Sequence, residues 1–87
     1  MRHIYITTDS GAHPLVVGLF YTRPRANGRF EVCKRGLEEQ GWTVVEDFGE
    51  EHHHRERMFP GLPIRLRRVV LRHKRRVREL VLERWAH

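Results

Sequence analysis

The chain has 87 residues, a length that favours one compact domain over two. Hydrophobic residues make up 39% of it and charged residues 32%, which is typical of a folded protein rather than a disordered one. No apolar run approaches the ~20 residues that a membrane span needs, and Met1 to Tyr5 lacks the apolar stretch of a signal peptide. Because Cys33 is the single cysteine, an internal disulfide is excluded, and we expect a soluble protein of the reducing cytoplasm.

The net charge of +6 is divided unevenly along the chain. Residues 1–61 contain eight Lys/Arg and nine Asp/Glu, a sum of −1, whereas residues 62–87 contain nine Lys/Arg and two Glu, a sum of +7. The basic character is therefore a property of the last segment, which predicts a localised surface for an anionic partner.

Two strands are predicted near the N-terminus. Arg2 to Thr8 is rich in β-branched and aromatic residues and stops at the turn-forming cluster Asp9-Ser10-Gly11. Leu15 to Thr22 is almost continuously apolar, which is typical of a strand covered on both faces. We therefore expect this second strand in the centre of the sheet.

A short helix is predicted after a break that contains Pro24 and Gly28. Phe30, Cys33 and Leu37 recur at i, i+3 and i+7, the spacing of one helix face. Gly41 stands where a left-handed residue ends many helices. An alternative keeps Arg29 to Cys33 as a hairpin strand.

A third strand is predicted over Trp42 to Phe48, so that strand, helix and strand would form a parallel βαβ step. The polar segment Gly49 to Gly61, which contains Pro60, is expected to be a surface loop.

The segment Leu62 to Ala86 is predicted to form one long amphipathic helix, with Pro63 in its first turn. At 100° per residue, one apolar face collects Leu62, Leu66, Val69, Val70, Val77, Leu80 and Val81. This face should pack on the sheet. The predicted fold class is therefore α+β, a single domain ordered ββαβα, in which a basic C-terminal helix covers a three-stranded sheet.

The predicted binding site for an anionic partner lies on the basic side of this helix, with a second contact in the turn Arg23 to Arg29. Its residues are Arg65, Arg67, Arg68, Arg72, Lys74, Arg75, Arg76, Arg78, Arg23, Arg25 and Arg29. Arginines spaced along one face can follow a phosphate backbone and bind its oxygens in pairs. The alternative is a solvated face whose charges pair with the acidic stretch Glu46 to Glu56.

A protein interface is predicted from a second, narrower apolar stripe within the basic face. Ile64, Leu71 and Leu82 share this stripe, where a lone domain would leave them in water. A partner helix, such as one from another copy, would cover them. Trp85, near the chain end, is added to this interface.

Two further clusters carry residue types of active sites. Asp9, Ser10 and His13 lack the spacing of a nucleophile elbow or a phosphate loop, and turns favour the same residues. The adjacent triplet His52-His53-His54 does not project from one face of a strand or helix. We therefore predict no catalytic residue, no metal site and no cofactor.

The sequence thus predicts a small non-enzymatic protein that binds nucleic acid or a nucleoprotein complex. One alternative is a protein-binding inhibitor or adaptor of a phage or mobile element, with an acidic protein partner or a homodimer. It would be similar to anti-CRISPR proteins only in its size and lack of motifs. A small ribonuclease-like toxin is the third hypothesis.

Overall fold

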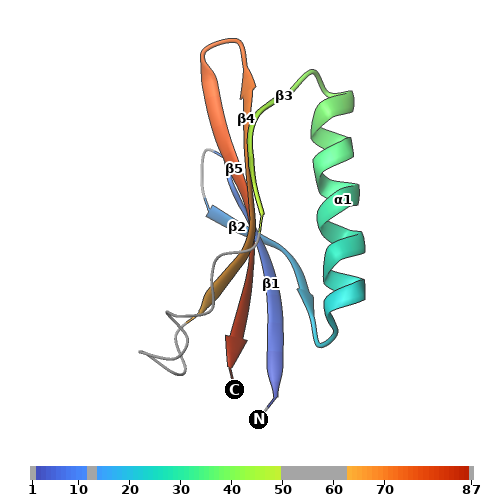
Figure 1. Cartoon of the computed structure of the whole chain (residues 1–87). Coiled ribbons are helices and arrows are strands. Elements are labelled where there is room, and N and C mark those ends of the chain that lie inside the picture. The colour runs from blue at the N-terminus through green and yellow to red at the C-terminus, as the bar shows by residue number, and fades with distance from the viewer. Residues whose placement is uncertain (1, 12–13, 50–62, 87) are drawn as a thin grey trace.

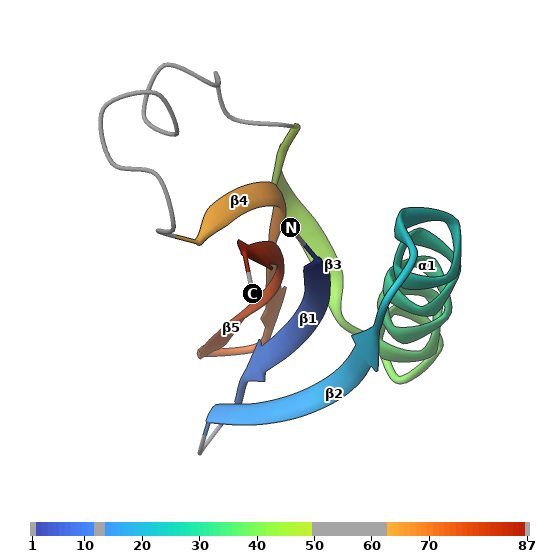
Figure 2. The same ribbon diagram turned by 90° about the horizontal axis from the view of Figure 1, so that it is seen from below.

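A computed structural model describes residues 2–11, 14–49 and 63–86. Along the chain the elements are β1 (His3–Ser10), β2 (Pro14–Phe20), α1 (Arg23–Glu39), β3 (Thr43–Phe48), β4 (Ile64–His73) and β5 (Arg76–Ala86). The strands form one antiparallel five-stranded sheet in the order β2-β1-β5-β4-β3. Helix α1 lies against one face of this sheet (Figures 1 and 2).

The predicted ββαβα fold with a three-stranded sheet and a long C-terminal helix is wrong. The segment expected to be one helix from Leu62 to Ala86 is the β4–β5 hairpin, in which His73 and Arg76 are the last pair before the turn. Leu62 itself lies outside the described residues. The domain is still α+β, but its single described helix lies in the middle of the chain.

Alternation along β4 and β5 explains why this segment is a hairpin. Val69 and Leu71 of β4 are buried with Leu80 and Leu82 of β5 on the face toward α1. Val81, between the two leucines of β5, points to the opposite face. A β-bulge between Arg65 and Arg67 shifts the phase within β4. That shift breaks the simple alternation and produces the false helical spacing.

Helix α1 is longer than predicted and includes the expected turn Arg23 to Arg29. Pro24 stands at its start, where the missing N–H costs no hydrogen bond. Ala26, Phe30 and Leu37 form its buried stripe, so the predicted helical face of Phe30 and Leu37 is confirmed. The alternative of a hairpin strand over residues 29–33 is wrong.

Gly41 ends α1 as predicted. Its φ of 99° lies in the left-handed region, its N–H donates to the Glu38 carbonyl, and the N–H of Trp42 donates to the Leu37 carbonyl, both at 3.0 Å. These two bonds form a Schellman motif, which satisfies carbonyls at the helix end. The motif also fixes where Trp42 leaves the helix.

The strands predicted near the N-terminus and after α1 are confirmed as β1 and β3, but β2 is not central. It forms one edge of the sheet and β3 forms the other. The two edge strands run in the same direction, because four antiparallel steps separate them. The expected βαβ step therefore joins the two edges, and β1, β5 and β4 lie between its strands.

The core lies between α1 and the sheet. Its buried residues are Tyr5, Ala26, Phe30, Leu37, Ile64, Leu66, Val69, Leu71, Leu80 and Leu82. No described helix covers the opposite face, which we call the uncovered face (Figures 1 and 2).

Truncation of Leu71 and Val77 distinguishes the hairpin from a single helix. Leu71 is 0% exposed and Val77 is 61% exposed. We expect Leu71→Ala to lower the free energy of unfolding by about 2–5 kcal/mol and Val77→Ala to change it by less than about 0.5 kcal/mol, measured by urea denaturation. A helix over this segment would place Val77 in the core and Leu71 in water, so the reverse order of effects would contradict the hairpin.

Candidate anion-binding site at the tip of the β4–β5 hairpin

The tip of the β4–β5 hairpin stands at one end of the molecule, the same end as the C-terminus of α1 (Figure 1). Strand β1 pairs with β5 only as far as the Asp9–Leu80 pair, and β3 pairs with β4 only as far as Thr43–Arg72. The His73–Arg76 pair and the turn of Lys74 and Arg75 therefore have no neighbouring strand on either side among the described residues. This outermost part of the tip is a two-stranded ribbon.

The turn contains a basic residue in an unfavourable backbone conformation. Lys74 has a φ of 57°, the only positive φ at a non-glycine position among the described residues. A left-handed conformation costs an L-residue with a side chain roughly 1–2 kcal/mol relative to the right-handed one. Glycine or asparagine would adopt it more readily, so the lysine adds charge here at a cost in stability.

Four exposed bases surround the turn, and we call them the tip cluster: Arg72, Lys74, Arg75 and Arg76. Arg72 Nε donates to the backbone carbonyl of Lys74 at 3.1 Å, which braces the turn. Within the described part of the chain, none of the four forms an ion pair with a carboxylate. Their positive charge is therefore available to a partner.

The tip cluster borders a hollow that reaches toward the end of α1. One part, of about 410 Å³, is lined by Gly11, Trp42, Arg76, Val77 and Arg78. The adjoining part, of about 680 Å³, is lined by Gln40, Trp42, His73, Lys74, Arg75, Arg76 and Arg78. No carboxylate is among these lining residues. The C-terminus of α1 contributes about half a negative charge, which the surrounding cations outweigh.

Trp42 lines both parts of the hollow. Its ring lies 5.5 Å from the His73 ring, and the Arg78 guanidinium carbon lies 4.8 Å from the Trp42 centroid. A Cβ at Gly41 would meet His73 Nε2 at 3.0 Å, so a side chain at this position would also displace the His73 ring. Neither Trp42 nor His73 was predicted from the sequence to be part of the site. The position of Trp42 directly after the predicted helix end was the one available signal.

Arg78 joins the two hairpins of the sheet. Its Nε and Nη2 donate to the two carboxylate oxygens of Asp9 at 2.9 and 2.5 Å. Beside it, the Ser10 hydroxyl accepts the Glu79 N–H at 2.9 Å. The predicted anion-binding residue Arg78 is therefore already neutralised, and the Asp9 and Ser10 side chains hold β1 against β5. His13, the third residue of that cluster, lies outside the described residues.

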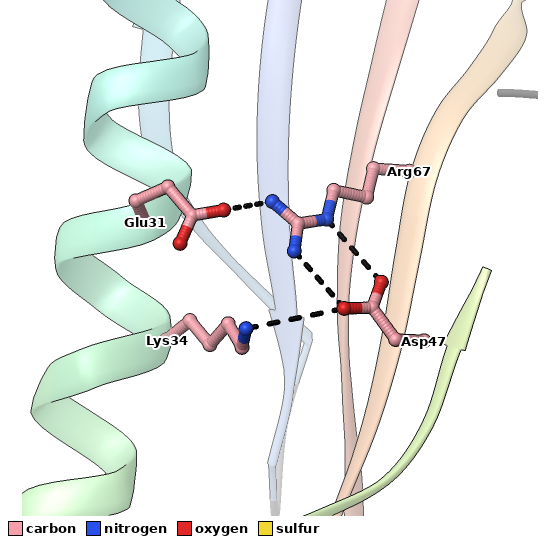
Figure 3. Close-up of polar contacts among 4 residues, drawn as sticks. All are labelled: Glu31, Lys34, Asp47 and Arg67. Carbon is pink, nitrogen blue, oxygen red and sulfur yellow. Dashed lines mark hydrogen bonds and ion pairs between the residues drawn. The ribbon is translucent and has the colours of Figure 1, made fainter. Parts of the chain in front are cut away.

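Arg67 joins α1 to the sheet (Figure 3). Its Nε and Nη2 donate to the Asp47 carboxylate at 3.3 and 3.0 Å, and its Nη1 donates to Glu31. Lys34 approaches the same Asp47 carboxylate at 3.9 Å, and the Arg67 guanidinium lies over the Phe30 ring at 4.9 Å. Arg67 is thus bound within the protein.

Arg68 is held on the uncovered face. Its Nη2 donates to Glu79 Oε1 at 2.6 Å, and its guanidinium lies 5.0 Å from the Phe48 ring centroid. The hydrogen bond from Arg68 is the main cause that lowers the pKa of the Glu79 carboxyl, and the charges of Arg68 and Arg65 add to it. The same bond raises the pKa of Arg68.

The other predicted binding residues lie away from the tip. Arg23 and Arg25 stand at the start of α1, at the opposite end of the molecule from the tip (Figure 1). Arg29 donates to the Val17 carbonyl at 3.0 Å, and Arg23 and Arg65 also have contacts within the protein. The predicted arginines therefore do not form one surface.

The predicted protein-interface residues do not form one surface either. Ile64, Leu71 and Leu82 are buried in the core beneath α1, so the sheet accounts for their apolar character. Trp85 is exposed. It lies on the uncovered face, because its partner Ile4 and the core residue Tyr5 alternate along β1.

The described residues contain no group of three or more His, Cys, Asp or Glu placed to hold a metal ion. The triplet His52-His53-His54 lies outside them. None of the helices in the described ranges is both long and apolar enough to span a membrane.

Comparison with known proteins finds no match to a family model, a curated protein or a solved structure.

The Arg68–Glu79 pair predicts a pH-dependent contribution to stability. Because the folded state lowers the pKa of Glu79, this contribution is complete above the ordinary glutamate pKa of about 4.3 and is lost as the pH falls through the lowered value. We expect Glu79→Gln to lower the free energy of unfolding at neutral pH. The difference from the unmodified protein should shrink in acid.

Urea denaturation at a series of pH values measures this difference. Glu38→Gln is the control, because Glu38 is exposed on α1 and has no ion pair among the described residues. A difference for Glu79→Gln that stays constant or grows below pH about 4.3 would contradict the assigned role.

Proposed function

We propose that this protein binds nucleic acid through the tip cluster of the β4–β5 hairpin. The observation that carries the proposal is the separation of the bases into two groups. Arg67, Arg68 and Arg78 are neutralised by carboxylates, whereas the tip cluster is exposed and has no acidic partner among the described residues. The exposed positive charge of the β4–β5 hairpin is therefore concentrated at its tip.

The shape of the tip supports this partner. The major groove of B-DNA is about 12 Å wide and admits a two-stranded β-ribbon. Basic side chains on such a ribbon can reach phosphates on both sides of the groove, and arginine can bind phosphate oxygens in pairs. The adjoining hollow extends the cationic surface as far as Trp42.

The backbone at Lys74 gives independent support. Conformationally unfavourable residues persist where the surrounding structure holds them, and they are concentrated at functional sites. A lysine at a φ of 57° places a charge at the outermost point of the hairpin, where glycine would be more stable. This pattern suits a position selected for contact with a partner.

The salt dependence of binding tests the proposal. A fluorescently labelled DNA duplex is titrated with the protein at several salt concentrations, and the anisotropy is followed. Four phosphate contacts predict that log K falls with log salt concentration with a slope of about −3.6. Arg75→Ala should weaken binding and reduce the magnitude of that slope by about 1.

Two further variants separate binding from folding. Lys74→Gly should weaken binding in the same way while raising the free energy of unfolding by roughly 0.5–1 kcal/mol, because it relieves the turn. Arg25→Ala removes the same charge from an exposed position at the start of α1 and should leave the slope unchanged.

Three results would refute the proposal: no binding at low salt, an equal effect of Arg25→Ala and Arg75→Ala, or equally tight binding of polyglutamate. The last result would show a general site for acidic polymers, including acidic proteins.

A further inference from the structure

The uncovered face carries a continuous group of apolar side chains on β2, β1 and β5. We call it the apolar patch: Ile4, Ile6, Val16, Leu19, Val81 and Trp85. Val16, Leu19 and Trp85 are exposed, and the other three are half-buried. An exposed group of this size on a small domain indicates a contact surface.

The strand register places these side chains in neighbouring rows. Val16 pairs with Thr8, which pairs with Val81 on the other side of β1. Leu19 pairs with Ile6 in the next row. Ile4 and Trp85 form a pair at the end of the same face. The patch is therefore contiguous rather than a set of scattered residues.

The rest of the uncovered face has no excess positive charge. Apart from Arg72 of the tip cluster, its strand residues with charge are Arg65, Arg68, Glu46, Glu79 and Glu83, which sum to −1. Arg68 is bound to Glu79, and Glu83 lies opposite Arg65 in the β4–β5 register. This face has no excess positive charge to attract a nucleic acid, in contrast to the tip cluster.

We propose that a second copy of this chain packs on the uncovered face, sheet against sheet, with the apolar patches in contact. A two-fold axis brings the same patch of each copy together. The patch contains no charge, so this self-contact involves no like-charge repulsion at its centre. The proposal is independent of the proposed nucleic-acid binding, which uses another part of the molecule.

The size of the patch suits a dimer of low affinity. Three strands at about 4.8 Å spacing and about seven residues at 3.3 Å each give a patch of about 15 by 23 Å. Two such patches bury on the order of 700 Å², which is the size of a weak, transient contact rather than of a permanent one. We therefore expect a reversible dimer that forms at high micromolar concentrations.

Leu15 and Val16 provide a matched pair of test positions. They are consecutive in β2 and 62% and 57% exposed, but they point to opposite faces of the sheet. Val16 belongs to the apolar patch, whereas Leu15 lies on the α1 side. The same substitution at each position therefore separates packing through the uncovered face from pairing along the edge of β2.

Sedimentation equilibrium of nuclease-treated protein at high salt tests the proposal. High salt weakens contacts bridged by nucleic acid but leaves an apolar contact intact. The full chain should be dimeric at high micromolar concentration. Val16→Lys should raise the dissociation constant at least tenfold, and Leu15→Lys should leave it unchanged. Leu19→Lys provides a second patch variant, and urea denaturation confirms that each variant folds.

Two results would overturn the proposal. A strict monomer at every concentration would mean that no second copy covers the face. Equal dissociation by Leu15→Lys and Val16→Lys would assign the contact to the β2 edge instead. Neither result bears on the tip cluster, because the binding test reports salt dependence and not association state.

Discussion

The rest of the structure depends on the position of β5 between β1 and β4. Its backbone pairs with β1 from Leu80 to Ala86 and with β4 from Arg76 to Arg84. This register places Leu80 and Leu82 beneath α1 and sends the intervening side chains to the uncovered face. Because β5 begins at Arg76 but pairs with β1 only from Leu80 onward, the β4–β5 hairpin extends past the end of β1. The pairing of β5 with β1 and β4 in the centre of the sheet therefore supports the projecting tip.

The bases of β4 and β5 acquire different roles through partners that are distant in the sequence. Arg78 binds Asp9 from the first strand, and Arg67 binds Glu31 and Asp47 from the helix and the third strand. These ion pairs join elements of the fold and remove their arginines from the accessible charge. The tip cluster remains because none of the described carboxylates forms an ion pair with it. Its charge is thus a consequence of topology and not only of composition.

Local patterns in the sequence predicted β1, β3 and the end of α1, since each rests on a β-branched run or on Gly41. They failed for the last segment, because the bulge at Arg65 and Arg67 breaks the alternation and the turn at Lys74 contains no glycine, proline or asparagine. The continuous apolar run of β2 predicted burial on both faces, yet β2 is an edge strand. Strand pairing between residues far apart in the sequence determines both the hairpin of the last segment and the edge position of β2. For the same reason, the sequence contained the tip cluster but did not distinguish it from the paired arginines.

Nuclear Overhauser effects across β4 and β5 test the account most directly, because the tip, the core and the uncovered face all require this pairing. We predict backbone contacts between Val69 and Leu80 and between Arg72 and Val77. We also predict the absence of sequential amide–amide contacts along residues 68–82 other than at the turn. A continuous series of such amide contacts, with no contact between the two strands, would show a helix and would contradict the account.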